Sequence, residues 1–136
     1  MGRVACIDYG IKRIGLAISD ENRIIASSLG VLQAQKTSSE TIELLLKTLS
    51  PYEINLILIG NPIHLNGKVG FLADEVEHFA NLLRTHVSCE VRLWDERLST
   101  SVAERSLKEG GMSRKKRSKV VDAVAAIIIL QSFLGY

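Results

Sequence analysis

The stretch from Val4 to Leu16, Val-Ala-Cys-Ile-Asp-Tyr-Gly-Ile-Lys-Arg-Ile-Gly-Leu, constrains the fold more than any other part of the chain. It predicts two strands that meet at a tight turn, because Val4 to Ile7 and Ile14 to Ile18 are apolar runs. Gly10 and Gly15 supply the backbone freedom that the connection needs. We therefore expect the chain to begin with a β-hairpin.

Asp8 interrupts this apolar pattern at the point where the first strand ends. A carboxylate at the end of a buried strand is costly unless it is hydrogen-bonded or neutralised by a cation. Two interpretations stay open. Asp8 either closes an Asx-turn over Gly10, with its side chain bonded to a backbone N–H, or it shares its charge with a bound cation.

Length and charge limit the possible classes of protein. A chain of 136 residues has room for one domain with a single core, and its low aromatic content predicts an aliphatic core. A net charge of +2 argues against a general coating of nucleic acid but allows a local basic patch. Cys6 and Cys89 lack metal-ligand spacing, so we expect two free thiols in a reducing compartment.

The sequence contains no recognisable membrane segment. The first residues enter a strand almost at once, without the basic and apolar regions of a signal peptide. The apolar run Val120–Leu130 is shorter than the roughly 20 residues that span a bilayer, and it contains Asp122. We therefore expect a soluble cytoplasmic protein that does not contact membranes.

The remaining hydrophobic periodicity predicts a mixed α/β class. Thr37 to Glu40 has the spacing of a capping box, before a helix that ends at Pro51. The almost wholly apolar run Ile54–Ile59 is typical of a strand covered on both faces and reached by a crossover connection. The other expected elements are a turn at Asp20-Glu21-Asn22, a strand at Ile24–Leu32, a helix at Leu72–Val87, a strand at Val91–Trp94, a short helix capped by Ser99 or Thr100, and a helix at Val120–Leu134.

Three acids stand out by their positions: Asp8, Glu96 beside Asp95, and Asp122. Each has a structural alternative, since Glu96 can pair with a neighbouring cation and Asp122 can favour the N-terminal end of its helix. In an α/β sheet, however, the ends of neighbouring strands form one crevice where ligands bind. Carboxylates that share a crevice repel one another, and hard divalent cations relieve that repulsion. Oxygen ligands without His or Cys favour Mg²⁺ or Mn²⁺ over zinc.

The segment from Ser113 to Lys119 carries five positive charges within seven residues and no negative charge. Nothing in a core requires such a run, and the expected final helix follows it directly. A solvated basic loop without a partner is one interpretation. The other is a clamp that holds substrate phosphates close to Asp122.

These residues also carry a family resemblance that covers nearly the whole chain. The sequence resembles the YqgF family, the Holliday junction resolvase or pre-16S rRNA nuclease group of the ribonuclease H-like superfamily. Four motifs in order make the resemblance specific. They are Ile7-Asp8-Tyr9-Gly10 with Lys12-Arg13-Ile14-Gly15, Gly60-Asn61-Pro62 with Asn66-Gly67, Asp95-Glu96-Arg97-Leu98-Ser99-Thr100, and Lys119 with Asp122, Ala125, Ala126 and Ile129-Leu130-Gln131.

The resemblance implies a ribonuclease H-like fold, with a five-stranded mixed sheet in the order 3-2-1-4-5 and helices on both faces. It also implies a metal-dependent nuclease that holds Mg²⁺ or Mn²⁺ through Asp8, Glu96 and Asp122. We expect structured RNA or branched DNA as the partner and a monomer or weak homodimer as the assembly. The residues expected to contact nucleic acid are Lys12, Arg13, Arg97, Arg114, Lys115, Lys116, Arg117 and Lys119, and those expected in the surrounding loops are Asn61, Asn66, Asp95 and Thr100.

The sequence departs from the family pattern at Asn61, His64 and Ser99, which replace the usual Leu, Asn and Thr. These departures affect the expected substrate more than the expected chemistry. Competing interpretations are a Holliday junction resolvase, a nucleic-acid-binding protein without catalysis in ribosome assembly or transcription, and a sugar-kinase-like nucleotide binder. The last has little support, because the chain is too short for the duplicated domain of that superfamily.

Overall fold

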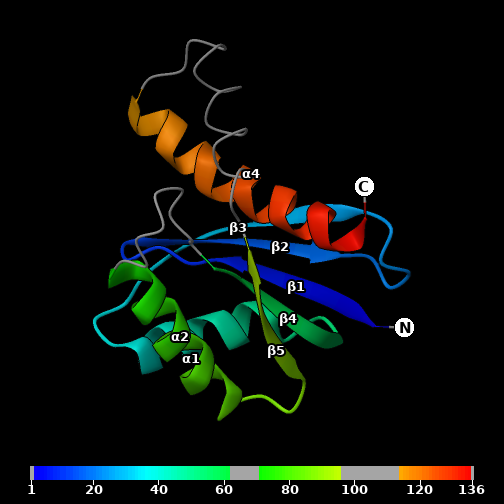
Figure 1. Cartoon of the computed structure of the whole chain (residues 1–136), viewed down its shortest axis with the longest axis horizontal. Coiled ribbons are helices and arrows are strands. Elements are labelled where there is room, and N and C mark those ends of the chain that lie inside the picture. Colours follow the sequence, from blue (N-terminus) through cyan, green and yellow to red (C-terminus); the bar gives the residue numbers. More distant parts are fainter. Residues whose placement is uncertain (1, 62–70, 96–113, 136) are drawn as a thin grey trace.

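A single mixed sheet forms the centre of the protein in the computed structural model. The structure describes residues 2–61, 71–95 and 114–135. At residues 61, 71–73, 95 and 114–123 it describes the backbone alone. The strands are β1 Arg3–Asp8, β2 Arg13–Ser19, β3 Ala26–Gln33, β4 Ile54–Asn61 and β5 Glu90–Asp95. Their order is β3-β2-β1-β4-β5 (Figure 1). The β1–β2 and β2–β3 pairs are antiparallel, whereas β1, β4 and β5 run parallel. This is the order that the resemblance implies.

Helices cover both faces of this sheet. Helices α1 (Ser38–Leu49) and α2 (Phe71–Arg84) pack against one face, and α4 (Arg114–Leu134) packs against the other (Figure 1). Among the residues whose burial is described, those buried on both faces are almost all aliphatic, and Phe79 is the aromatic exception. The aliphatic core expected from the composition is therefore confirmed.

Side-chain alternation along β1 assigns its residues to the two faces. Ala5 and Ile7 belong to the cluster formed with α1 and α2, whereas Val4 and Cys6 belong to the cluster formed with α4. A strand has a side-chain period of two, so Asp8 continues the series of Val4 and Cys6. The last residue of β1 therefore lies on the α4 side of the sheet.

Helix α1 begins and ends where its sequence predicts. The Thr37 side chain accepts a hydrogen bond from the backbone N–H of Glu40 at 3.1 Å, which satisfies one of the free donors of the first turn. At the other end, the backbone N–H of Ser50 donates to the Lys47 carbonyl, and Pro51 follows. Proline cannot supply the N–H that another helical turn requires.

The start of α4 corrects the sequence-based expectation. The sequence predicts that the last helix follows the basic run, at Val120–Leu134, but the helix already begins at Arg114. The physical reason is that Lys and Arg are good helix formers, so a run of cations need not interrupt a helix. The short helix expected after Ser99 or Thr100 lies outside the described residues.

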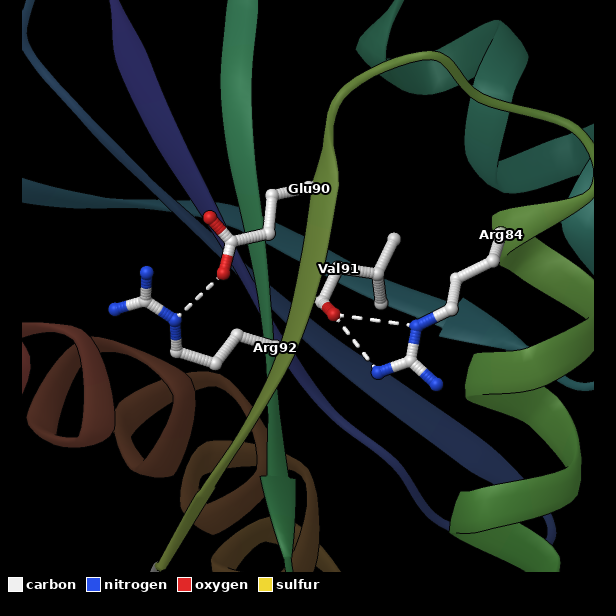
Figure 2. A network of polar contacts seen from close by, with 4 residues as sticks. All are labelled: Arg84, Glu90, Val91 and Arg92. Carbon is white, nitrogen blue, oxygen red and sulfur yellow. Dashed lines mark hydrogen bonds and ion pairs between the residues drawn. The ribbon is translucent and has the colours of Figure 1, made fainter.

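The last residue of α2 fixes the start of the edge strand β5 (Figure 2). The guanidinium of Arg84 donates to the Val91 carbonyl through Nη2 at 2.8 Å and Nε at 3.3 Å. On the same strand, Arg92 Nε lies 2.9 Å from Glu90 Oε2, and this hydrogen bond lowers the pKa of the exposed Glu90 carboxylate. Because an edge strand offers unpaired backbone groups, the bond to Val91 removes one site of unwanted pairing.

Two further expectations concern the cysteines and membranes. Cys6 is buried and Cys89 half-buried, and neither forms a disulfide. Burial raises the pKa of the Cys89 thiol, so this cysteine remains a neutral thiol at neutral pH. In the described part of the chain, no helix has the length and apolar character needed to cross a bilayer.

Candidate functional site

Three polar residues end three neighbouring parallel strands. The carboxyl ends of these strands lie along one edge of the sheet, which we call the carboxyl edge. Asp8 is the last residue of β1, Asn61 of β4 and Asp95 of β5. The register pairs Ile7 with Ile59 and Asn61 with Asp95, so the three ends are level to within about one residue. Strands lie about 5 Å apart, which places the ends of β1 and β5 about 10 Å from each other. Ligands of α/β sheets bind at such carboxyl ends.

Asp8 lies between two glycines on the neighbouring strands. It pairs with Gly15 of β2, and the next step of the β1–β4 register after Ile7 and Ile59 brings it level with Gly60. The positions directly opposite the half-buried Asp8 on both neighbouring strands are therefore glycines. Glycine within a strand often marks a place where a ligand or another backbone approaches closely.

The turn after Asp8 is fixed at both of its ends. A Cβ atom on Gly10 would lie only 2.4 Å from the Arg13 carbonyl oxygen, so this position requires glycine. The backbone N–H of Ala34 donates to the Lys12 carbonyl at 2.9 Å, which ties the turn to the end of β3. Gly10 was expected to supply backbone freedom, but its φ is not positive, and the position requires glycine because of this close approach. Gly15, expected to free the connection, lies instead within β2 opposite Asp8.

Tyr9 is a site residue that the sequence pattern did not reveal. Its ring packs against Phe79 of α2, with the ring centroids 4.9 Å apart and the planes tilted by 50°. Burial, and secondarily the negative charge of Glu75, raises the pKa of the Tyr9 phenol. The sequence singles out Tyr9 only as an aromatic residue directly after Asp8 in a chain with few aromatics and as a member of the Ile7-Asp8-Tyr9-Gly10 motif, and neither signal indicates the contact with α2.

The expected cationic residues fall on two elements. Lys12 is exposed in the β1–β2 turn, and the half-buried Arg13 begins β2, where it pairs with Gln33. The positions of Arg114 to Arg117 and Lys119 form the first turns of α4. In Figure 1 this orange end of α4 extends past the strands, on the side of the view where the β1–β2 turn lies.

The structure describes only some of the other expected site residues. Asp122 belongs to α4, five residues after Arg117. Glu96 follows the last residue of β5 in the sequence but lies outside the described residues, as do Arg97, Asn66 and Thr100. The structure therefore brings Asp8, Asn61 and Asp95 to one edge, and the convergence of Asp8, Glu96 and Asp122 stays a prediction.

The donor chemistry at this edge fits a hard divalent cation. Asp8 offers carboxylate oxygens, whereas Cys6 points into the core shared with α4 and Cys89 precedes β5 at the opposite edge. Oxygen donors without thiolates suit Mg²⁺ or Mn²⁺. Among the side chains that the structure describes, no cluster of three or more His, Cys, Asp or Glu residues forms a complete metal site. Ligation of a cation by Glu96 and Asp122 together with Asp8 stays a prediction.

Sequence comparisons identify relatives of this chain. The profile of the RuvX family, described as "Holliday junction resolvase", matches residues 2–136. A protein of Protochlamydia amoebophila named "Putative pre-16S rRNA nuclease" is 53% identical over 138 aligned residues, which cover 97% of this chain and 92% of the relative. A protein of Halothermothrix orenii with the same name is 42% identical, with 98% of this chain and 95% of the relative covered.

Comparison of structures gives the same fold. A Thermus thermophilus RuvC structure in complex with a Holliday junction substrate matches with a TM-score of 0.57, covering 99% of this chain and 97% of that chain. A second RuvC structure from the same organism matches with a TM-score of 0.54. The identities are 15% and 14%, so these matches establish the ribonuclease H-like fold and nothing further.

Proposed function

The chain belongs to the RuvX family, and from this premise we propose that it is a metal-dependent nuclease that cleaves phosphodiester bonds in structured RNA. Its proposed role is the processing of the 5′ end of pre-16S rRNA during ribosome biogenesis, which would place it in the cytoplasm. The observation that carries the proposal is the half-buried Asp8, held between Gly15 and Gly60 at the carboxyl edge of the sheet. The name of the 53% identical relative favours RNA as the substrate.

Three acids are proposed to hold Mg²⁺ or Mn²⁺: Asp8, Glu96 or its neighbour Asp95, and Asp122. The spacing supports Asp122, because Ala126 and Ile129 follow it by four and seven residues and are buried in the cluster that α4 forms with the sheet. When bound, the metal would activate a water molecule and stabilise the leaving oxygen of the phosphodiester. The contribution of the chain is to hold carboxylate oxygens at the strand ends and to orient the substrate phosphate.

The first turns of α4 support an anionic substrate. A helix N-terminus carries a partial positive charge, so cations there cost about 0.3–1 kcal/mol each at exposed positions. Arg114, Lys115, Lys116 and Arg117 all occupy this end, and its first turn contains no acidic residue. The arrangement is unfavourable for the helix alone. It becomes favourable when a phosphate binds, because the charges and the dipole then act in the same direction.

A second candidate function is the cleavage of Holliday junctions. The description of the RuvX family favours it, because that description names a Holliday junction resolvase. Both activities break phosphodiester bonds, so the same acids would serve either substrate. A non-catalytic role in ribosome assembly or transcription would retain the nucleic-acid contacts without cleavage. We propose that the protein binds RNA as a monomer or a weak homodimer.

One cleavage experiment separates these functions. Purified protein with Mn²⁺ is given a pre-rRNA fragment or a four-way DNA junction, and the wild type is compared with Asp8→Asn and with Asp20→Asn. Asp20 lies after β2, at the opposite edge of the sheet, so Asp20→Asn controls for the loss of one carboxylate. We expect cleavage of the RNA, loss of cleavage in Asp8→Asn and retention in Asp20→Asn. Full activity of Asp8→Asn would contradict the catalytic assignment, and cleavage of the junction alone would favour the resolvase.

A further inference from the structure

Ile11 is an exposed hydrophobic residue at the candidate site. The large hydrophobic residues exposed in the described part of the chain are Ile11 at 57%, Ile24 at 55% and Ile25 at 61%. Ile24 and Ile25 lie in the connection between β2 and β3, whereas Ile11 lies in the turn between β1 and β2. Since β1 ends at Asp8, Ile11 is only three residues from the proposed metal ligand and shares its edge of the sheet.

The backbone around Ile11 is held in place on both sides. Tyr9 is anchored to Phe79 of α2, and Gly10 packs so closely on the Arg13 carbonyl that no side chain fits. Beyond Ile11, the Lys12 carbonyl accepts the hydrogen bond from Ala34. A contact made by Ile11 would therefore cost little additional ordering of the chain, which favours binding.

The chemistry of the turn combines an apolar group with a cation. Lys12 directly follows Ile11 and is exposed, so the turn presents both groups at the edge that carries Asp8. Nucleic acids can accept such a combination, because cations bind the backbone phosphates and apolar side chains of several proteins enter the minor groove. The minor groove of A-form RNA is wide and shallow, so a short branched side chain can reach it. The narrower minor groove of B-form DNA is a poorer match.

We propose that Ile11 packs against the riboses of the minor groove of structured RNA, next to the phosphate that the metal site cleaves, while Lys12 pairs with a flanking phosphate. The inference rests on the proposed function and adds a residue that selects for A-form substrate. A single exposed isoleucine is common on protein surfaces and means little by itself. What distinguishes Ile11 from Ile24 and Ile25 is its position in the turn that directly follows Asp8, at the carboxyl ends of the parallel strands.

The test measures affinity for an RNA hairpin over a range of salt concentrations, without added divalent metal so that the RNA stays intact. Ile11→Ala should weaken binding about tenfold at every salt concentration, which corresponds to roughly two methylene groups left in water. The slope of log affinity against log salt should not change, because no phosphate contact is lost. Lys12→Ala should flatten that slope, and Ile11→Leu should restore most of the affinity.

Matched variants distinguish an RNA contact from a general effect of surface hydrophobicity and from self-association. Ile24→Ala, with the same change at an equally exposed position, should leave RNA affinity within about twofold of the wild type. Relative to the wild type, Ile11→Ala should lose less affinity for a B-form DNA duplex of the same sequence than it loses for the RNA. Wild-type affinity of Ile11→Ala for RNA would overturn the inference while the proposed function stands. The same result with a shift from dimer to monomer in sedimentation would assign Ile11 to a contact between copies. Failure of the wild type to bind or cleave any RNA would overturn the proposed function itself.

Discussion

Tyr9 and Phe79 lie ring against ring, with centroids 4.9 Å apart, and this contact joins the residue after Asp8 to the middle of α2. Phe79 is buried in the cluster shared by α1, α2 and the sheet, and Tyr9 packs against that cluster from its margin. The backbone that positions the Asp8 carboxylate therefore depends on the packing of α2.

Replacement of Tyr9 by alanine should lower both stability and activity. The lost ring contact and apolar burial should reduce the free energy of unfolding by about 2 kcal/mol, since Tyr9 is only half-buried. Tyr9→Phe keeps the ring, so its urea midpoint and its cleavage rate should stay close to those of the wild type. A wild-type cleavage rate in a folded Tyr9→Ala variant would show that the contact does not position Asp8.

The same phenol should make stability sensitive to alkaline pH. Burial raises the pKa of folded Tyr9 above its ordinary value of 10.0, so the folded state resists ionisation. Its contribution is complete below the ordinary value and is lost as pH rises through the folded pKa. Urea unfolding at increasing pH should therefore show a steeper loss for the wild type than for Tyr9→Phe, which has no proton to release. Parallel profiles would contradict this assignment.

Asp20 should make stability sensitive to acid. Its Oδ1 accepts hydrogen bonds from the backbone N–H groups of Ile24 at 2.7 Å and Ile25 at 2.9 Å, and these bonds lower the pKa of the carboxyl below its ordinary 3.8. The contribution is present above the ordinary value and is lost as pH falls through the folded pKa. Thermal unfolding in acid should show a smaller loss for Asp20→Asn than for the wild type. Glu21→Gln, one residue along the same turn, should retain the wild-type loss.

Local sequence patterns predict most of the fold. The apolar run Ile54–Ile59 predicts a strand covered on both faces, and β4 lies between β1 and β5 with helices on either side. The cap at Thr37 is likewise a local feature, because donor and acceptor lie three residues apart. Local sequence patterns do not predict where α4 begins, since the same basic residues suit a helix and an exposed loop.

The candidate site is harder to predict from the sequence than the fold, because its geometry depends on pairing between distant segments. The position of Asp8 at a strand end follows from its apolar neighbours, as predicted. Its location opposite Gly15 and level with Gly60 depends on strand register. The Tyr9–Phe79 contact joins residues far apart in the chain, and no local periodicity indicates it.

Binding of a divalent cation should stabilise the folded protein if Asp8 and Asp122 share a site. A ligand that binds only the native state adds about 2.7 kcal/mol when its concentration is about a hundred times the dissociation constant. Mn²⁺ should therefore raise the melting temperature of the wild type in calorimetry. The double variant Asp8→Asn, Asp122→Asn should show little of this shift, although its melting temperature without metal should not fall, because carboxylate repulsion is relieved. Equal shifts in both proteins would argue against a shared site.

The basic start of α4 should determine how strongly RNA binding depends on salt. In the variant Lys115→Ala, Lys116→Ala, two cations leave the N-terminal end of the helix. Each lost phosphate contact should flatten the slope of log affinity against log salt by about 0.7 to 0.9. Sequence preference should hardly change, because phosphate contacts orient the ligand without reading its bases.

The melting temperature shows whether a loss of RNA affinity in this variant comes from lost phosphate contacts or from a destabilised fold. Alanine is the best helix former, and removal of positive charge from a helix N-terminus is favourable, so the variant should melt no lower than the wild type. The matched control is Lys36→Ala, Lys47→Ala, which removes two lysines from the region of α1. If α4 holds the substrate, only the α4 variant should lose affinity at low salt. Equal salt slopes in the two double variants and the wild type would move the phosphate contacts to another surface, with Lys12 beside Asp8 as the first alternative.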